Sequence, residues 1–87
     1  MKVLLSSIAK NDIKLLMRVF NAERENKGIE FLDDLKESIT KIQEHSQTRL
    51  IIEKQITVDK MQNFPVHIHY IFENENSLLV TAIFKED

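Results

Sequence analysis

The sequence predicts a single α+β domain, residues 1–87, with the element order β-α-α-β-β-β, in which a helical hairpin packs on one face of a small, mainly antiparallel sheet. Apolar residues recur every three or four positions in residues 13–42, which is typical of amphipathic helices. They recur at every second position in residues 64–72, which is the period of a β-strand. The polar stretch Glu73–Ser77 separates this strand from the apolar run Leu78–Phe84, and this pattern predicts a β-hairpin.

The N-terminal half of the chain predicts one short strand and two helices. Val3–Leu5 is the expected strand, and Ser6 and Ser7 are candidate N-caps for the first helix. This helix is expected to run to residues 26–28, with Gly28, the only glycine, as a left-handed C-cap. The second helix follows at once and ends at residues 45–47, so the two helices form an antiparallel hairpin. The expected core-facing residues are Ile13, Leu16, Met17, Phe20, Leu32, Leu35, Ile39 and Ile42.

Charged residues of the second helix are expected to stay in solvent. Glu30, Asp33 and Asp34 are expected in its first turn, where the helix dipole favours negative charge. Together with Glu37 they are interpreted as a solvated helix face.

Arg49–Val58 predicts a third strand with one polar face, followed by a short polar link at Asp59–Asn63. Lys54 interrupts the apolar face, which is typical of an edge strand, a bulge or a side chain whose stem snorkels. The expected inward residues are Leu50, Ile52, Ile56 and Val58.

The C-terminal hairpin is the expected centre of the core. Tyr70 is expected in this core, with its hydroxyl reaching the sheet edge. Phe72 is expected to pair with Leu78 across the turn. Leu78–Phe84 is apolar on both parities apart from Thr81, so it is expected to be a central strand covered on both sides, or nearly so. The expected inward residues of the first strand are Phe64, Val66, Ile68, Tyr70 and Phe72.

Two histidines, His67 and His69, are expected on the sheet face opposite the helices, because residues two apart in a strand share a face. A zinc site would need a third ligand. The expected register places Thr81 opposite His69 and Ile83 opposite His67, and neither binds zinc. We therefore expect no metal site and no cofactor.

Weak catalytic candidates remain, namely His67, His69, Tyr70 and Lys85, of which the histidines have an unperturbed pKa near ~6.5. Lys54, Lys60 and Lys85 could gather at one sheet edge as a basic patch, although lysine lacks the guanidinium fork that clamps phosphate. The sequence has no Ser/His/Asp order, glycine-rich phosphate loop or paired catalytic carboxylates.

A family resemblance covers nearly the whole chain. Its most specific part is the motif Phe64-Pro65 with Ile68 and Tyr70, followed by a polar turn and an apolar strand. The chain resembles the RelE/ParE toxins of bacterial toxin–antitoxin systems, and it looks closer to the ParE or plasmid-stabilisation branch. Helical segments that add to the resemblance are Ala9, Asp12-Ile13, Gly28–Leu32 and Ile39–Ile42.

The resemblance implies a cytoplasmic growth inhibitor that is neutralised by a cognate antitoxin encoded beside it. Members of the ParE branch act on DNA gyrase, and members of the RelE branch cleave messenger RNA on the ribosome. Three departures remove the family's usual features. Val66 stands where an aromatic residue is usual, Thr57–Asp59 where arginines are usual, and Lys85–Asp87 where a histidine and an arginine-containing tail are usual.

Composition narrows the functions that the resemblance leaves open. Lys and Arg number 12 against 14 Asp and Glu, a net charge of -2 that argues against a nucleic-acid-gripping surface. The chain has no cysteine, no apolar run of the ~20 residues that a membrane span needs, and no signal-peptide pattern. Three hypotheses remain: a ParE-like toxin that binds an antitoxin and gyrase without catalysis, a RelE-like ribonuclease, which the charge disfavours, and an inactive relic serving as a binding module or homodimer.

Overall fold

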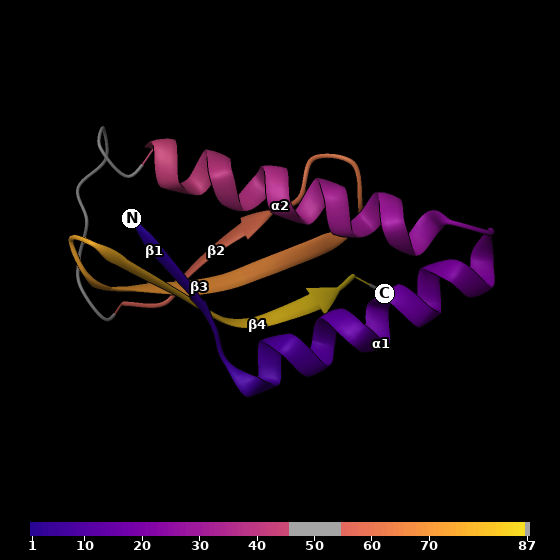
Figure 1. The fold of residues 1–87 in the computed structure, drawn as a ribbon, viewed down its shortest axis with the longest axis horizontal. Coiled ribbons are helices and arrows are strands. Elements are labelled where there is room, and N and C mark those ends of the chain that lie inside the picture. The colour runs from indigo at the N-terminus through magenta and orange to yellow at the C-terminus, as the bar shows by residue number, and fades with distance from the viewer. Residues whose placement is uncertain (46–54, 87) are drawn as a thin grey trace.

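The computed structural model describes residues 1–45 and 55–86, whose elements follow the predicted order (Figure 1). These elements are β1 (Lys2–Leu5), α1 (Ser7–Glu23), α2 (Lys27–His45), β2 (Thr57–Lys60), β3 (Val66–Asn74) and β4 (Ser77–Lys85). The sheet has the strand order β1-β4-β3-β2. β1 is parallel to β4, whereas β3 is antiparallel to both β2 and β4. The predicted α+β class and the mainly antiparallel sheet are therefore confirmed.

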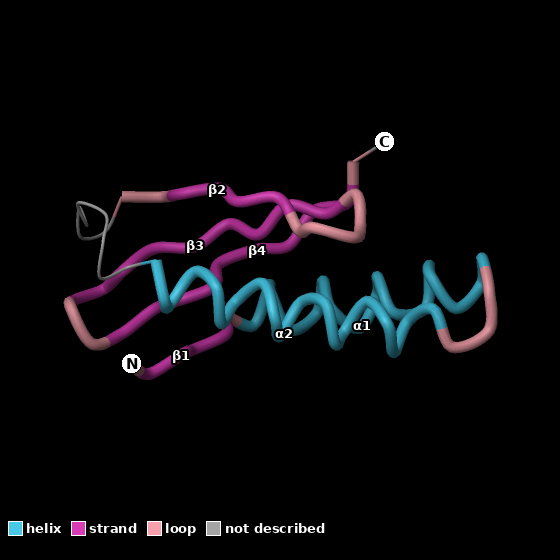
Figure 2. Tube along the Cα trace, turned by 90° about the horizontal axis from the view of Figure 1, so that it is seen from above, coloured by secondary structure: helices cyan, strands magenta, loops and turns pink. Residues whose placement is uncertain are grey.

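Both helices lie on the same side of the sheet, and their apolar faces pack against it (Figure 2). The predicted helix residues Leu16, Phe20, Leu35 and Ile42 are buried, and Ile13, Met17, Leu32 and Ile39 are partly buried against the same core. The predicted inward residues Phe64, Val66, Ile68, Tyr70 and Phe72 are buried as well. Neither helix among the described residues is long and apolar enough to cross a membrane.

The core contains two helix residues that are absent from the predicted set, Ala9 and Phe31, both fully buried. Each lies four positions before a predicted core residue, so the helical spacing could have found them. Phe31 packs against Phe20 and Phe64, with ring centroids 5.2 and 5.7 Å away. Phe20 and Phe64 lie 5.0 Å apart and nearly edge-to-face, which is a favoured aromatic geometry. This ring cluster joins both helices to the loop that precedes β3.

The helix ends differ from the prediction at the corner between α1 and α2. Ser6 is the N-cap of α1 as predicted, since its Oγ accepts a hydrogen bond from the Ala9 N–H. The left-handed C-cap predicted at Gly28 is wrong, because Gly28 lies inside α2 and the positive φ, 66°, belongs to Asn26. Gly28 instead allows close approach of the helices, since a Cβ there would lie 2.7 Å from the Met17 carbonyl oxygen.

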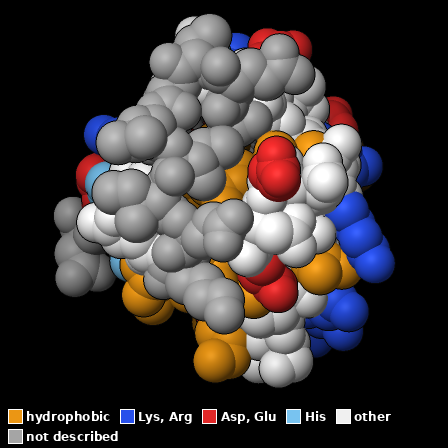
Figure 3. Space-filling view, turned by 90° about the vertical axis from the view of Figure 1, so that its left-hand side faces the viewer, with side chains coloured by type: hydrophobic (Ala, Val, Ile, Leu, Met, Phe, Trp, Pro, Cys, Tyr) orange, Lys and Arg blue, Asp and Glu red, His pale blue; other side chains and the backbone are white. Residues whose placement is uncertain are grey.

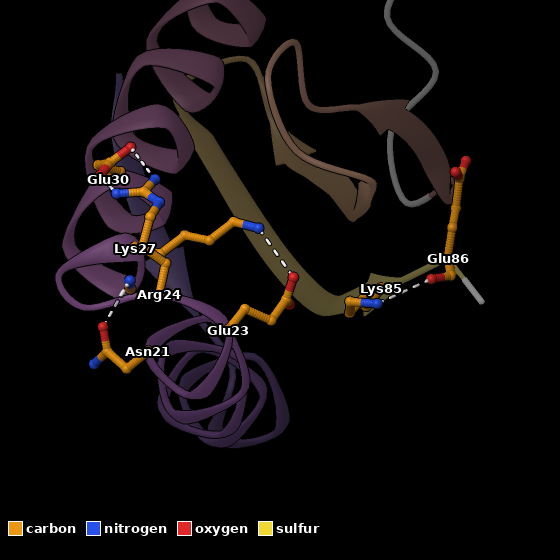
Figure 4. A network of polar contacts seen from close by, with 8 residues as sticks. Asn21, Glu23, Arg24, Lys27, Glu30, Lys85 and Glu86 are labelled. Carbon is orange, nitrogen blue, oxygen red and sulfur yellow. Dashed lines mark hydrogen bonds and ion pairs between the residues drawn. The ribbon is translucent and has the colours of Figure 1, made fainter.

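Polar side chains hold this corner (Figure 4). The Asn21 side-chain oxygen accepts a 2.8 Å hydrogen bond from the Gly28 N–H. The Arg24 guanidinium donates two hydrogen bonds to the Glu30 carboxylate, at 2.8 and 2.9 Å, and Lys27 pairs with Glu23 at 3.0 Å. The Arg24 hydrogen bonds hold the pKa of Glu30 below its usual range.

One member of the acidic cluster is not solvated, contrary to prediction. Asp34 is 7% exposed, and its carboxylate accepts hydrogen bonds from the Asn63 backbone N–H and side-chain amide, at 3.3 and 2.8 Å. Only Glu30 lies in the first turn of α2, because the helix begins earlier, at Lys27. Asp34 therefore ties α2 to the loop before β3, which a solvated face would not do.

The strand predicted at Arg49–Val58 differs from the structure in its bounds and in the side chains that face inward. β2 is Thr57–Lys60, so it includes part of the predicted link, while Leu50, Ile52 and Lys54 lie outside the described residues. Ile56 is 63% exposed and Val58 47%. The register explains the reversal, because Val58 pairs with His69 on the far side of the sheet, and Asp59 then accepts the Tyr70 hydroxyl hydrogen bond at 2.9 Å.

β4 is a central strand as predicted, but its coverage on both sides is not confirmed, since Phe84 is 53% exposed. Phe72 pairs with Leu78 as predicted. A β-bulge at Thr81 then shifts the register, so that His69 lies opposite Ala82 and His67 opposite Phe84. The Thr81 hydroxyl donates to the His69 carbonyl at 3.1 Å, which stabilises the bulge.

Candidate functional site

The sheet has an open face on the side away from the helices, where no described helix or strand covers it (Figure 2). Its residues follow from the strand register, because side chains alternate across a sheet. The open face includes Leu4 of β1, Val58 and Lys60 of β2, His67, His69 and Ile71 of β3, and Leu79, Ala82 and Phe84 of β4. Val58, Lys60 and Phe84 are exposed, and the other residues of this face are half-buried. Apolar side chains thus dominate this surface.

One end of the open face carries a charged cluster around Glu86. The Glu86 carboxylate lies 2.6 Å from His67 Nε2 and 3.5 Å from Lys60 Nζ. The backbone of Glu86 is held too, because its N–H donates to the Pro65 carbonyl at 2.7 Å. Lys85 Nζ lies 3.5 Å from the Glu86 carbonyl oxygen. One lysine and one histidine therefore lie next to the Glu86 carboxylate, and a second lysine lies next to its backbone carbonyl.

The positive side chains of this cluster already have an anionic neighbour, the Glu86 carboxylate. The hydrogen bond with His67 is the largest effect on Glu86 and lowers its pKa. Partial desolvation, the next largest effect, raises this pKa, and the charge of Lys60 lowers it further. Glu86 is therefore ionised at neutral pH. A phosphate that approached Lys60 or His67 would meet this negative charge, so the cluster is poorly suited to binding a phosphodiester.

The two histidines have separate surroundings. His69 packs its ring against Phe84, with centroids 4.8 Å apart and the planes at 73°, as in an edge-to-face aromatic pair. His67 instead contacts Glu86. Among the described residues, no three His, Asp or Glu side chains lie close enough together to hold a metal ion.

The other sequence candidates are split between the core and this cluster. Tyr70 is fully buried and donates its hydroxyl hydrogen bond to Asp59, so it does not reach a substrate on the open face. Lys60 and Lys85 both lie next to Glu86, while Lys54 is outside the described residues. The sequence pattern does not predict Glu86 in the site. Glu86 lies beside His67 because Val66 pairs with Lys85. The sequence of residues 85–87 alone does not predict this strand register.

A cleft of about 210 Å³ separates the C-terminal half of α2 from β2. Lys41 donates a 2.6 Å hydrogen bond to the Gln62 side chain at its rim. Its volume is below the ~300 Å³ at which pockets for drug-sized ligands begin. The cleft is lined by Ser38, Lys41, Ile42, His45, Asp59, Lys60, Gln62 and Ile68.

Comparison with solved structures shows the fold, whereas the sequence comparisons find no match. No family model matches the sequence, and no curated protein matches it. A solved structure described as the chromosomal ParDE TA system from P. aeruginosa contains a similar chain, with a TM-score of 0.81 at 10% sequence identity. The similarity covers 100% of this chain and 97% of that one. The chain therefore has a ParE-like fold, as the Phe64-Pro65 motif and the element order predict.

Proposed function

We propose that this chain is a ParE-like toxin component of a type II toxin–antitoxin system, which acts by binding proteins and is neutralised by a cognate antitoxin. The observation that carries the proposal is the whole-chain similarity, TM-score 0.81, to a chain of a ParDE system. In keeping with the ParE branch, the proposed target is DNA gyrase, the proposed location is the cytoplasm, and the proposed role is plasmid stabilisation through growth inhibition.

The open face supports action through protein binding. Val58 of β2 and Phe84 of β4 are 47% and 53% exposed, and half-buried Ile71, Leu79 and Ala82 lie on the same face. Contiguous exposed apolar residues on a small protein mark interaction surfaces, because a soluble monomer rarely leaves such a patch uncovered. A protein partner is the simplest ligand for a broad sheet face that is mostly apolar.

The charged cluster argues against the ribonuclease alternative. Cleavage of a phosphodiester needs a positioned acid and base together with stabilisation of the phosphate charge. Here His67 contacts Glu86, and the same carboxylate lies next to Lys60. The proposal therefore assigns no catalysis to the chain.

Inducible expression in a bacterial host, with and without the reading frame next to this gene, tests the proposal. We expect growth to stop when the chain is expressed alone and to recover when the neighbouring product is co-expressed and co-purifies with it. Phe84→Asp should remove the growth inhibition. The matched control is Ile29→Asp on α2, which alters a residue of similar exposure, 54%, and should leave inhibition unchanged. Normal growth and no complex would favour the inactive relic instead.

A further inference from the structure

Two basic side chains of the open face meet at one oxygen atom. Glu86 Oε1 lies 2.6 Å from His67 Nε2 and 3.5 Å from Lys60 Nζ. Lys60 and His67 are opposite each other in the pairing of β2 with β3, so both side chains leave the sheet on its open face. The open face is on the left in Figure 3, where histidine, basic and acidic side chains lie next to one another above exposed hydrophobic ones. We refer to the place between these two side chains as the Lys60–His67 subsite.

Glu86 occupies this subsite from an exposed position. It follows the last residue of β4, and a backbone hydrogen bond from its N–H to the Pro65 carbonyl, 2.7 Å long, holds it beside the start of β3. Its side chain is 40% exposed, and those of Lys60 and His67 are 57% and 32% exposed. Exposed ion pairs contribute little to stability because water screens them. Another anion can therefore replace the Glu86 carboxylate with little loss of stability.

The subsite lies at the margin of an apolar surface. His67 pairs with Phe84, which is 53% exposed. Val58, 47% exposed, is two residues before Lys60 in β2 and therefore lies on the same face. A ligand that covers the open face contacts these apolar side chains and reaches the subsite at one end. Apolar contacts in the centre with polar groups at the rim are typical of protein–protein interfaces.

We propose that the Lys60–His67 subsite receives an aspartate or glutamate side chain of the protein that binds the open face, and that Glu86 competes for the same subsite in the free chain. This inference rests on the proposed function, because it names the charged group that the partner of the open face carries. On binding, the partner carboxylate takes the place of the Glu86 carboxylate, which moves into solvent. An internal competitor lowers the apparent affinity by the fraction of time for which it fills the site. Glu86 is thus an autoinhibitory residue of the open face.

A phosphodiester of a nucleic acid fits the subsite less well than a protein carboxylate. Phosphate is best clamped by the guanidinium fork of arginine, and the arginines of the described residues, Arg18 and Arg24, belong to α1 and its C-cap on the other side of the sheet. A nucleic acid brings further phosphates, which a chain of net charge -2 repels at long range. A protein brings one carboxylate, the group that the subsite already holds.

Titration of the chain with two small monoanions, followed by the chemical shifts of its backbone amides, tests the inference. Acetate represents a protein carboxylate and dimethyl phosphate a phosphodiester, and both are added at constant ionic strength so that screening does not change. Glu86→Gln should bind acetate at least about fivefold more tightly than the wild type, with the largest shifts at Lys60 and His67. Glu86→Gln/Lys60→Gln should lose this gain. Glu75→Gln is the matched control, because Glu75 is an exposed glutamate of the β3–β4 turn with no ion pair among the described residues, and it should bind acetate like the wild type.

Three results would overturn the inference. Equal acetate affinity in Glu86→Gln and Glu75→Gln would show that Glu86 masks no subsite, and a gain that persists in the double variant would show that Lys60 does not hold the anion. Tighter binding of dimethyl phosphate than of acetate by Glu86→Gln would assign the subsite to a nucleic-acid backbone instead. Because the titration uses the chain alone, its failure leaves the proposed function standing. Failure of the chain to inhibit growth would remove the proposed function and, with it, the partner.

Discussion

Replacing Gly28 by alanine should destabilise the protein, even though alanine is the better helix former by about 1 kcal/mol. The added Cβ would lie 2.7 Å from the Met17 carbonyl oxygen and 2.8 Å from Asn21 Oδ1. Because the nearest atom belongs to the α1 backbone, the helices would have to separate, and such overpacking costs about 1–3 kcal/mol. The Asn21–Gly28 hydrogen bond, worth about 1 kcal/mol, would weaken or break. We expect a net loss of about 1–3 kcal/mol.

Urea unfolding followed by circular dichroism measures this loss as a lower midpoint with an unchanged slope. Asn21→Ala removes the hydrogen bond alone and should cost about 1 kcal/mol. Asn11→Ala is its control, since Asn11 is an exposed asparagine of the same helix whose side chain makes no hydrogen bond within the described residues, and it should not lower stability. A Gly28→Ala protein at least as stable as the wild type would refute the close-approach argument.

Ile68→Ala should lower the free energy of unfolding by about 2–5 kcal/mol because Ile68 is fully buried, whereas Ile56→Ala, at a 63% exposed residue, should change it by less than about 0.5 kcal/mol. If urea unfolding showed equal losses of stability for the two variants, the packing of Ile68 in the core would be contradicted. The pKa of Glu86 is lowered, chiefly by His67, so its stabilising contribution is present above the unfolded-state pKa and is lost as pH falls through the folded one. Glu86→Gln should therefore reduce the fall in unfolding temperature that occurs as the pH is lowered into the acid range. An unchanged fall would count against the stabilising interaction between Glu86 and His67. Purified protein should leave ribosome-bound messages intact, and the His67→Ala/His69→Ala variant should behave like the wild type in this assay. Message cleavage lost in that double variant would establish the ribonuclease function instead.

The parts of the fold that the sequence predicts are those decided by local periodicity. The even face of β3 and the core rows of both helices are confirmed because each residue is placed by its own element. Gly28 is different, since its role depends on the Met17 carbonyl in the other helix. The bulge at Thr81 depends on Ser6, whose hydroxyl donates to the Thr81 carbonyl from 75 residues away. The local spacing of apolar residues does not predict such contacts between residues far apart in the sequence.

The candidate site is predictable only in part for the same reason. Alternation alone places His67 and His69 on the open face. Their neighbours are set by the register, and the bulge moves Phe84 opposite His67, where the predicted register placed Ile83. Val58 joins the open face because β2 pairs as it does with β3. Two apolar residues of this face, Val58 and Phe84, therefore lie on a side that the sequence pattern does not predict, whereas Ile71 lies on the side that it predicts.

The open face depends on a structural support from the other side of the sheet. α1 is attached to β4 by two side-chain hydrogen bonds, from the Ser6 hydroxyl to the Thr81 carbonyl at 2.8 Å and from the Ile83 N–H to the Asp12 carboxylate at 2.9 Å. The first bond ends on the bulge residue Thr81, and the second ends on Ile83, the residue before Phe84. The segment of β4 that places Phe84 on the open face is therefore held from the opposite side of the sheet by the start of α1. A change at Ser6 or Asp12 would act on the open face without altering any residue of that face.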